Sequence, residues 1–210
     1  MIVAAQQPIV FIIDDDASVR DGVEDLLRSV GLGAQSFRSA EEFLGSRRPD
    51  VPGCIVLDVR LPGASGLEFQ RTLAQERIPL PVIFISGHGD IPMSVRAMQF
   101  GAIEFLAKPV RDQELLDAVN AAIERDRARR EQAELVGELR ERFDALTPRE
   151  REVLLLLTAR SQNKQIAYQL KLRENMVKIR RRQGMRKMRA RSLVELVRKA
   201  DKLDVSSGGP

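Results

Sequence analysis

The sequence of 210 residues has no tryptophan, one tyrosine, one histidine and one cysteine. A single cysteine, Cys54, excludes an internal disulfide and a zinc site built from several cysteines, and its apolar surroundings predict a small buried side chain. No apolar run approaches the roughly 20 residues that a transmembrane helix needs, and the first residues lack the pattern of a secretory signal. We therefore expect a cytoplasmic protein with no membrane partner.

Charge is distributed unevenly along the chain. Residues 1–142 hold 17 Lys and Arg against 23 Asp and Glu, a balance of −6, whereas residues 143–205 hold 17 against 7, a balance of +10. The basic segment favours a polyanionic partner, although a solvated basic surface is the simpler alternative. Because this half has few aromatic residues to stack on single-stranded bases, duplex DNA is the better candidate.

Short apolar runs alternate with helical patterns in the first half of the chain. We expect strands near residues 9–13, 34–37, 54–57, 82–85 and 103–106, with helices near 17–30, 39–45, 65–75, 91–100 and from 112 onward. Five repeats of strand then helix predict an α/β fold with a five-stranded, doubly wound parallel sheet. Ligands bind such sheets beyond the carboxyl ends of the strands, where the strand order switches.

The second half has a different organisation. The charged stretch 124–141 predicts an exposed helix that extends the fifth helix of the first half into a linker. Thr147, Pro148 and Glu150 form a capping-box helix start. Four short helices are expected near 148–158, 163–170, 174–188 and 192–203. The expected organisation is a first domain over 1–125, a helical linker over 126–142, an all-α helix-turn-helix domain over 143–205 and a disordered tail over 206–210.

Polar side chains lie at the ends of four expected strands. They are Asp14, Asp15 and Asp16 after the first strand, Asp58 after the third, Ser86 after the fourth and Lys108 after the fifth. Carboxylates gathered at one sheet edge repel one another and suit Mg²⁺, which prefers oxygen ligands. One carboxylate could then accept a phosphoryl group while the hydroxyl and the ammonium contact its oxygens. For any single aspartate a solvated loop charge is the favoured interpretation, but the coincidence at several strand ends argues against it.

The motifs that carry these residues are Asp14-Asp15, Asp58 followed by Leu61-Pro62-Gly63 and Gly66, Ser86-Gly87 and Lys108-Pro109. With them, residues 9 to about 125 resemble the receiver domain of bacterial two-component response regulators, which is flavodoxin-like. The resemblance implies that Asp58 is the phosphoacceptor and that Lys108 contacts the phosphate. It implies Ser86 and Phe105 as switch residues, and Mg²⁺ bound by Asp14, Asp15, Asp58 and the backbone carbonyl of Arg60.

The same resemblance bears on partners and chemistry. It implies that a sensor histidine kinase donates the phosphoryl group, and that the chain is no enzyme beyond its own phosphorylation and dephosphorylation. Asp16 is expected beside the metal ligands rather than among them. The lone histidine, His88, has no partner residue in the sequence for a metal site or a nucleophile relay, and a loop-shaping or surface role is favoured.

A second set of motifs runs from Leu146 to Leu154, through Asn163-Lys164-Gln165-Ile166-Ala167 and Val177-Lys178, to Met185–Met188 and Arg191-Ser192-Leu193. Here the chain resembles the LuxR-type DNA-binding domain of the NarL/FixJ family. The resemblance implies promoter binding and a homodimer that forms on phosphorylation. Basic residues on the recognition helix and the helix before it are the expected DNA contacts: Lys164, Lys178, Arg180, Arg181, Arg182, Arg186 and Lys187.

Several residues depart from the family pattern. Arg160 and Lys171 stand where glycine is usual, Arg173 replaces the Ser or Thr cap of the recognition helix, Met176 replaces a Thr and Arg180 a His, and Gly184 is expected to interrupt that helix. We expect DNA binding with a steep dependence on salt concentration and an altered or relaxed preference for DNA sequence. Two alternatives remain open: a signalling adaptor whose effector domain no longer reads DNA, and a Mg²⁺-dependent phosphohydrolase, which would leave the second half unexplained.

Overall fold

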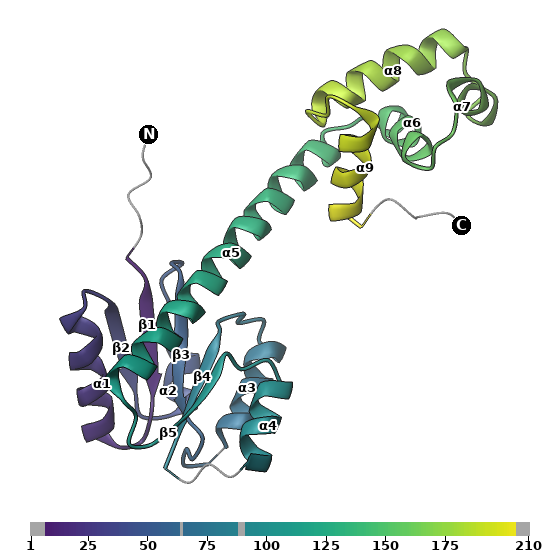
Figure 1. The fold of residues 1–210 in the computed structure, drawn as a ribbon. Helices are drawn as coiled ribbons and strands as arrows, with labels where there is room; N and C mark the ends of the chain where they lie inside the picture. The colour runs from purple at the N-terminus through teal and green to yellow at the C-terminus, as the bar shows by residue number, and fades with distance from the viewer. Residues whose placement is uncertain (1–6, 64, 88–90, 205–210) are drawn as a thin grey trace. The chain divides into compact units, whose positions relative to one another are not determined.

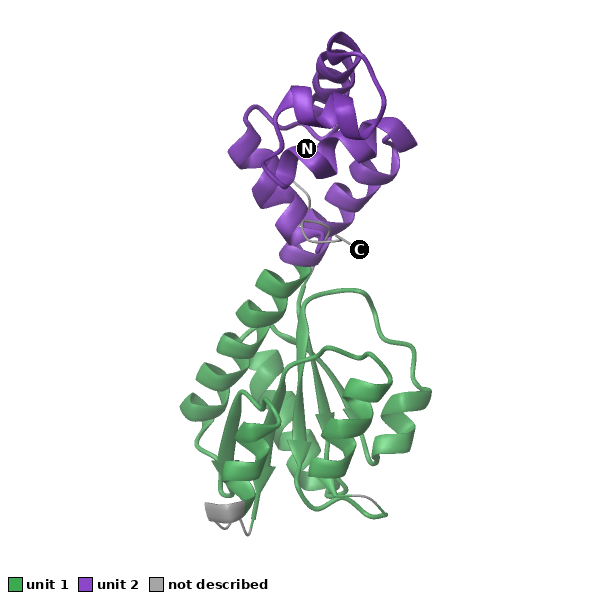
Figure 2. Ribbon diagram, turned by 90° about the vertical axis from the view of Figure 1, so that its right-hand side faces the viewer, with its two compact units in different colours: residues 1–130 green, residues 131–210 purple. Residues whose placement is uncertain are grey.

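The computed structural model describes residues 7–63, 65–87 and 91–204. The chain divides into two compact units, residues 1–130 and residues 131–210 (Figure 2). The expectations for His88 and for a disordered tail over 206–210 lie outside the described residues. None of the described helices is long and apolar enough to cross a membrane.

The first unit is an α/β fold, as the sequence predicts. Its elements in chain order are β1 (Ile9–Ile13), α1 (Ala17–Ser29), β2 (Gly33–Phe37), α2 (Ala40–Gly45), β3 (Gly53–Asp58), α3 (Gly66–Gln75), β4 (Val82–Ser86), α4 (Ile91–Gln99), β5 (Glu104–Ala107) and the first part of α5 (Asp112–Asp144). All strand pairs are parallel, and the strand order is β2-β1-β3-β4-β5.

Alternation along the central strands divides the core of this unit into two layers. Phe11 and Ile13 of β1 face a cluster that includes Phe43 of α2 and Phe69 of α3. The intervening β1 residues face a second cluster formed with α1 and α5. Helices therefore cover both faces of the sheet (Figure 1), because successive strand side chains point to opposite sides.

The strand order brings the carboxyl ends of β1 and β3 together at one edge of the sheet. β1 pairs with β2 on one side and β3 on the other, with Ile13 opposite Leu57, so the carboxyl ends of β1 and β3 are neighbours at the switch point. Gly66 begins α3 close to this edge. A Cβ at this position would lie 2.5 Å from the Asp58 carbonyl oxygen, which explains why glycine is required there.

Helix α5 is 33 residues long, and the predicted linker over 126–142 lies inside it. In the first unit, the buried Asp126 carboxylate accepts a hydrogen bond of 3.1 Å from the Gly53 backbone N–H and pairs with Arg129 and Arg130 at 2.7 Å. Arg130 also pairs with Asp50. These contacts join α5 to the start of the central strand β3.

The second unit is all helical around its own core. The end of α5 is followed by α6 (Pro148–Thr158), α7 (Asn163–Gln169), α8 (Glu174–Lys187) and α9 (Leu193–Lys202). The buried core includes Leu139, Phe143, Leu154, Val177 and Leu196. The capping box of Thr147 and Glu150 is present, as predicted.

The departures from the family pattern have visible backbone consequences. Arg160 and Lys171 have φ values of 61° and 52°, so both adopt the left-handed conformation that favours glycine. Arg173 precedes α8 without a side-chain capping bond. These expectations are confirmed, yet all four helices form.

The expectation for Gly184 was wrong. Helix α8 runs without interruption through this position, and Gly184 is buried. A Cβ there would lie 2.9 Å from Cγ of Leu154 on α6. The glycine therefore permits close packing of α8 against α6, a tertiary reason that the helix sequence alone does not reveal.

Candidate phosphoacceptor site and DNA-binding helix

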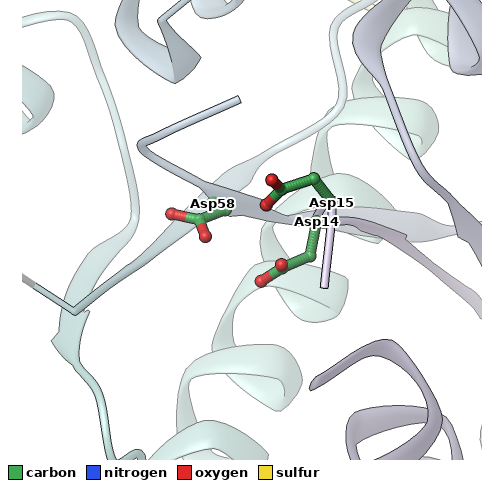
Figure 3. Close-up of side chains that lie close together, drawn as sticks. All are labelled: Asp14, Asp15 and Asp58. Atoms are coloured by element: carbon green, nitrogen blue, oxygen red, sulfur yellow. The ribbon is translucent and has the colours of Figure 1, made fainter. Parts of the chain in front are cut away.

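Three carboxylates converge at the carboxyl edge of the sheet. Asp14 and Asp15 follow β1, and Asp58 ends β3; one oxygen of each lies within 4.8 Å of the others (Figure 3). Asp14 is fully buried and Asp58 nearly so, whereas Asp15 is exposed. The arrangement offers only oxygen ligands and is open to solvent on one side, which suits a hard divalent cation that keeps some of its water.

Lys108 joins two of these carboxylates. Its Nζ donates to Oδ2 of Asp14 at 2.7 Å and to Oδ2 of Asp58 at 2.8 Å. Burial by itself would lower the pKa of Lys108, but the hydrogen bonds with the two carboxylates outweigh it and raise the pKa, so the lysine stays charged. For Asp14 the burial is the larger effect and raises the pKa, despite the opposing hydrogen bond from Lys108.

Backbone hydrogen bonds also position the residues around the triad. The Arg60 N–H donates to Oδ1 of Asp58 at 3.0 Å, which orients that carboxylate. The Lys108 N–H donates to the Ser86 carbonyl at 2.8 Å, so the ends of β4 and β5 are joined, and the Lys108-Pro109 peptide bond is cis. Ser86 is buried at the end of β4, beside strand β3, which carries Asp58.

Asp16 lies beside the triad, since its backbone N–H donates to Oδ1 of Asp14 at 2.9 Å, whereas Phe105 lies on β5. Asp16 caps α1: its Oδ1 accepts from the Ser18 N–H at 2.8 Å and from the Ser18 hydroxyl at 2.7 Å, and these bonds lower its pKa. Phe105 on β5 is half-buried, with its ring centroid 6.3 Å from that of Phe84. Asp16 is thus a helix cap, and Phe105 stands at the edge of the core.

The predicted DNA contacts lie mainly on α8, but they are not equivalent. Val177 and Gly184 face the core, which turns Lys178, Arg182 and Arg186 toward solvent. Arg180 and Arg181 are half-buried on the flanks of the helix, and Lys164 is exposed on α7.

Lys187 is engaged inside the second unit. Its Nζ donates to Oε2 of Glu150 at 2.7 Å and to the Ala145 carbonyl at 3.2 Å. Burial would raise the pKa of Glu150, but the bonds from Lys187 and Thr147 outweigh it and lower the pKa. This pair links α8 to the start of α6, so Lys187 is the least available of the basic residues predicted to contact DNA.

Two features were not predicted from the sequence. Asp126 accepts a hydrogen bond from Gly53 and its neighbour Arg130 pairs with Asp50, and both partners are distant in the chain. Spacing in the charged stretch indicated only local helix pairs. Asn175 is exposed on the first turn of α8. Its place near the start of the expected recognition helix was the available sequence signal, but the DNA contacts were predicted from positive charge, which an asparagine lacks.

Comparison with known proteins agrees with this combination of an acidic switch-point site and a basic helical unit. Residues 10–120 match the family of response regulator receiver domains, and residues 144–200 match the luxR family of bacterial regulatory proteins. The chain therefore belongs to the two-component response regulators that carry a LuxR-type DNA-binding domain, the NarL/FixJ family. Members of this family are transcription regulators rather than enzymes in the usual sense.

Individual relatives cover nearly the whole chain. Nodulation protein W of Bradyrhizobium diazoefficiens is 54% identical over 204 residues, which span 97% of this chain and 90% of that protein. Response regulator protein TodT of Pseudomonas putida is 43% identical over 93% of this chain and 86% of its own length. The solved structure of response regulator StyR is similar with a TM-score of 0.80 and 46% identity, covering 93% of this chain and 99% of that one.

Proposed function

We propose that Asp58 accepts a phosphoryl group from a phosphohistidine of a sensor histidine kinase. A carboxylate oxygen of Asp58 attacks phosphorus, the phosphorus–nitrogen bond of the donor breaks, and the imidazole leaves as an acyl phosphate forms. One observation carries this proposal: Lys108 Nζ lies 2.7 Å from a carboxylate oxygen of Asp14 and 2.8 Å from one of Asp58, so the three side chains meet at one place. The lysine would contact the phosphoryl oxygens.

We further propose that the bound cation is Mg²⁺, held by Asp14, Asp15, Asp58 and the carbonyl oxygen of Arg60. The fit rests on the three carboxylate oxygens that lie within 4.8 Å of one another. When bound, Mg²⁺ would neutralise the negative charge that the phosphoryl group brings to an acidic site. The chain's own part is to hold these oxygens together and to keep Lys108 charged.

Signal output would follow from Ser86 and Phe105. We propose that the Ser86 hydroxyl turns toward the phosphoryl group and that Phe105 then moves further into the core, which shifts the α4–β5 face to a dimer-forming state. The exposed apolar side chains Val95 and Met98 on α4, 48% and 46% exposed, support this choice of face. Dimer formation would place two copies of α8 on paired half-sites of a promoter.

The second unit would supply the DNA contacts. We propose that Lys164, Lys178, Arg182 and Arg186 contact phosphates, with half-buried Arg180 and Arg181 contributing at the edges and Lys187 least. Residues 126–142 would connect the two functions as a linker. A histidine kinase and promoter DNA as partners require the protein to act in the cytoplasm.

A phosphodonor experiment tests the site. The full chain is incubated with acetyl phosphate and MgCl₂, and phosphorylation is followed by intact-protein mass spectrometry. Wild type should be labelled, and Asp58→Ala or EDTA should abolish labelling. Asp25→Ala, which changes an exposed carboxylate on α1, is the matched control and should be labelled as wild type. Labelling of Asp58→Ala to the same extent would overturn the assignment.

A DNA experiment tests the output. Genomic fragments are pulled down with wild type and with Asp58→Ala after phosphodonor treatment, and the recovered sites are sequenced. Sites should be enriched by phosphorylated wild type and not by the variant. Recovery of the same weak, unselective set by both would favour the adaptor alternative, although the intact helices of the second unit support DNA binding.

A further inference from the structure

Three of the five exposed residues in the first two turns of α8 are uncharged, and the other two, Glu174 and Lys178, form an ion pair with each other. Asn175 is exposed, and Met176 and Ile179 are 38% and 42% exposed. Asn175 and Ile179 are four residues apart and therefore lie on the same face of the helix, with Met176 at its edge. Val177 is fully buried on the opposite side, so core packing fixes which face is presented. Exposed apolar groups at this place have no role in the core.

Positive charge surrounds these three residues. Lys178 lies beside them, and Arg182 and Arg186 continue the same face one and two turns further along; all three are exposed. Lys178 pairs with Glu174 at 3.4 Å, whereas neither arginine has an ion pair among the described residues. A neutral, partly apolar patch bordered by exposed guanidinium groups fits a partner with anionic margins and an uncharged centre. The major groove of duplex DNA has this pattern.

The residue types indicate which bases would be read. An asparagine amide matches N6 and N7 of adenine with two hydrogen bonds, and aliphatic side chains contact the C5 methyl group of thymine. Guanine is read by arginine or lysine, whereas the N-terminal residues of a recognition helix contact bases. The exposed arginines of α8 lie further from its start, and Lys178 is paired with Glu174 at 3.4 Å. The first turns of α8 are therefore equipped for A·T pairs.

We infer that Asn175 and Ile179, with Met176 beside them, read neighbouring A·T pairs in the major groove of each half-site. Asn175 would bind adenine, and Ile179 and Met176 would pack against a thymine methyl group. This inference rests on the proposed DNA-binding function and adds the base preference and the residues that determine it.

The test replaces single atoms of the DNA. Duplexes are first selected from a random-sequence pool with the full phosphorylated chain, and the enriched duplex is then rebuilt with each thymine changed to deoxyuridine and each adenine to 7-deazaadenine. Loss of one buried methyl group should weaken binding about fourfold at one thymine or more per half-site. Loss of the adenine N7 acceptor should weaken binding roughly five- to tenfold at one adenine.

Variants then assign each effect to a side chain. The double variant Met176→Ala/Ile179→Ala should bind thymine and deoxyuridine duplexes equally, and Asn175→Ala should lose the sensitivity to 7-deazaadenine. Val194→Ala changes an apolar residue of α9 that is 62% exposed, and it should keep both sensitivities. Because the base changes are made with wild-type protein, the test does not depend on how well a variant folds.

The possible outcomes distinguish base reading from DNA binding itself. Selected duplexes that bind tightly but show no response to deoxyuridine or 7-deazaadenine would overturn the base assignment and leave DNA binding intact. Responses that persist in Met176→Ala/Ile179→Ala and in Asn175→Ala would overturn the residue assignment. Failure to select any duplex would reject the proposed DNA binding and this inference with it.

Discussion

At the acidic edge, the positive charge of Lys108 lies against the negative charges of Asp14 and Asp58. Lys108 is held by two carboxylates that would also ligate a divalent cation, so lysine and cation compete for Asp14 and Asp58. Placing three carboxylates together without a cation would be costly, because like charges at short range disfavour ionisation. Lys108 thus offsets the repulsion between these carboxylates and should weaken the affinity of the site for metal.

We predict that Lys108→Met tightens Mg²⁺ binding on the order of tenfold, because the variant removes a positive charge next to two ligands. The same variant should be phosphorylated more slowly, since methionine cannot donate a hydrogen bond to the phosphoryl oxygens. Calorimetric titration with MgCl₂ measures the first effect. Arg111→Met, which removes an exposed cation in the same unit, is the control and should leave the affinity unchanged. Weaker binding by Lys108→Met would contradict this account.

The buried Asp14 gives the site a pH dependence. Burial raises the pKa of Asp14, and a protonated carboxyl group cannot ligate a cation, so Mg²⁺ affinity is complete above the raised pKa and is lost as pH falls through it. The decline should begin at a higher pH than for an exposed aspartate. Titrations at decreasing pH should show this, together with proton release on binding. An affinity that stays constant down to the ordinary aspartate range would exclude the prediction.

At the level of helices, α6 and α8 are joined by an ion pair and by close packing. Glu150 and Lys187 lie 2.7 Å apart, and Gly184 packs against Leu154. These contacts belong to the second unit and set the orientation of the recognition helix. They also explain how α8 tolerates Gly184, a poor helix former, and the absence of a side-chain capping bond at Arg173.

Gly184→Ala tests the packing. Alanine has a higher helix propensity by about 1 kcal/mol, but its Cβ would lie 2.9 Å from a buried leucine, and overpacking costs roughly 1–3 kcal/mol. We expect a net decrease in the free energy of unfolding, measured by hydrogen exchange of α6 and α8 amides. Gln183→Ala, at the adjacent exposed position, should be stabilising or neutral. Equal stabilisation by both variants would show that the close approach is unimportant.

Over the whole molecule, charge is separated into an acidic half with a balance of −6 and a basic half with a balance of +10. The basic half carries the proposed DNA contacts, and each phosphate that the protein neutralises contributes about −0.9 to the slope of log affinity against log salt concentration. The acidic half carries the residues proposed for metal binding and phosphoryl transfer. The two functions can therefore be separated by measurement.

We predict a steep salt dependence of DNA binding, and a slope that is shallower by about 0.9 in Arg186→Gln, because the variant no longer neutralises one phosphate. Fluorescence anisotropy with the selected duplex at several salt concentrations gives the slopes. Arg38→Gln, which changes an exposed arginine of the first unit, should keep the wild-type slope. Asn175→Ala should also keep it, since a base contact changes affinity without releasing counterions. A shallow wild-type slope would contradict the assignment of these phosphate contacts.

The amino-acid sequence by itself determined the layered α/β fold, the helical second half and the residues of the acidic edge. Apolar runs mark strands, caps mark helix starts, and parallel strands bring Asp14, Asp58 and Lys108 to the same edge. The resemblance to the LuxR-type domain also marked Arg160 and Lys171 as positions usually held by glycine. These features are local, or follow from a topology that local features imply.

Only the tertiary structure decided the rest. Gly184 would weaken an isolated helix, but it becomes a packing position once Leu154 lies against it. In the sequence, nothing distinguishes Asp126 from the other charged residues around it. Its role follows from the hydrogen bond that it accepts from Gly53, which is distant in the chain. Lys187 is engaged by Glu150, while Asn175 and Ile179 face solvent because Val177 faces the core. Such roles depend on contacts between distant residues, which sequence spacing does not encode.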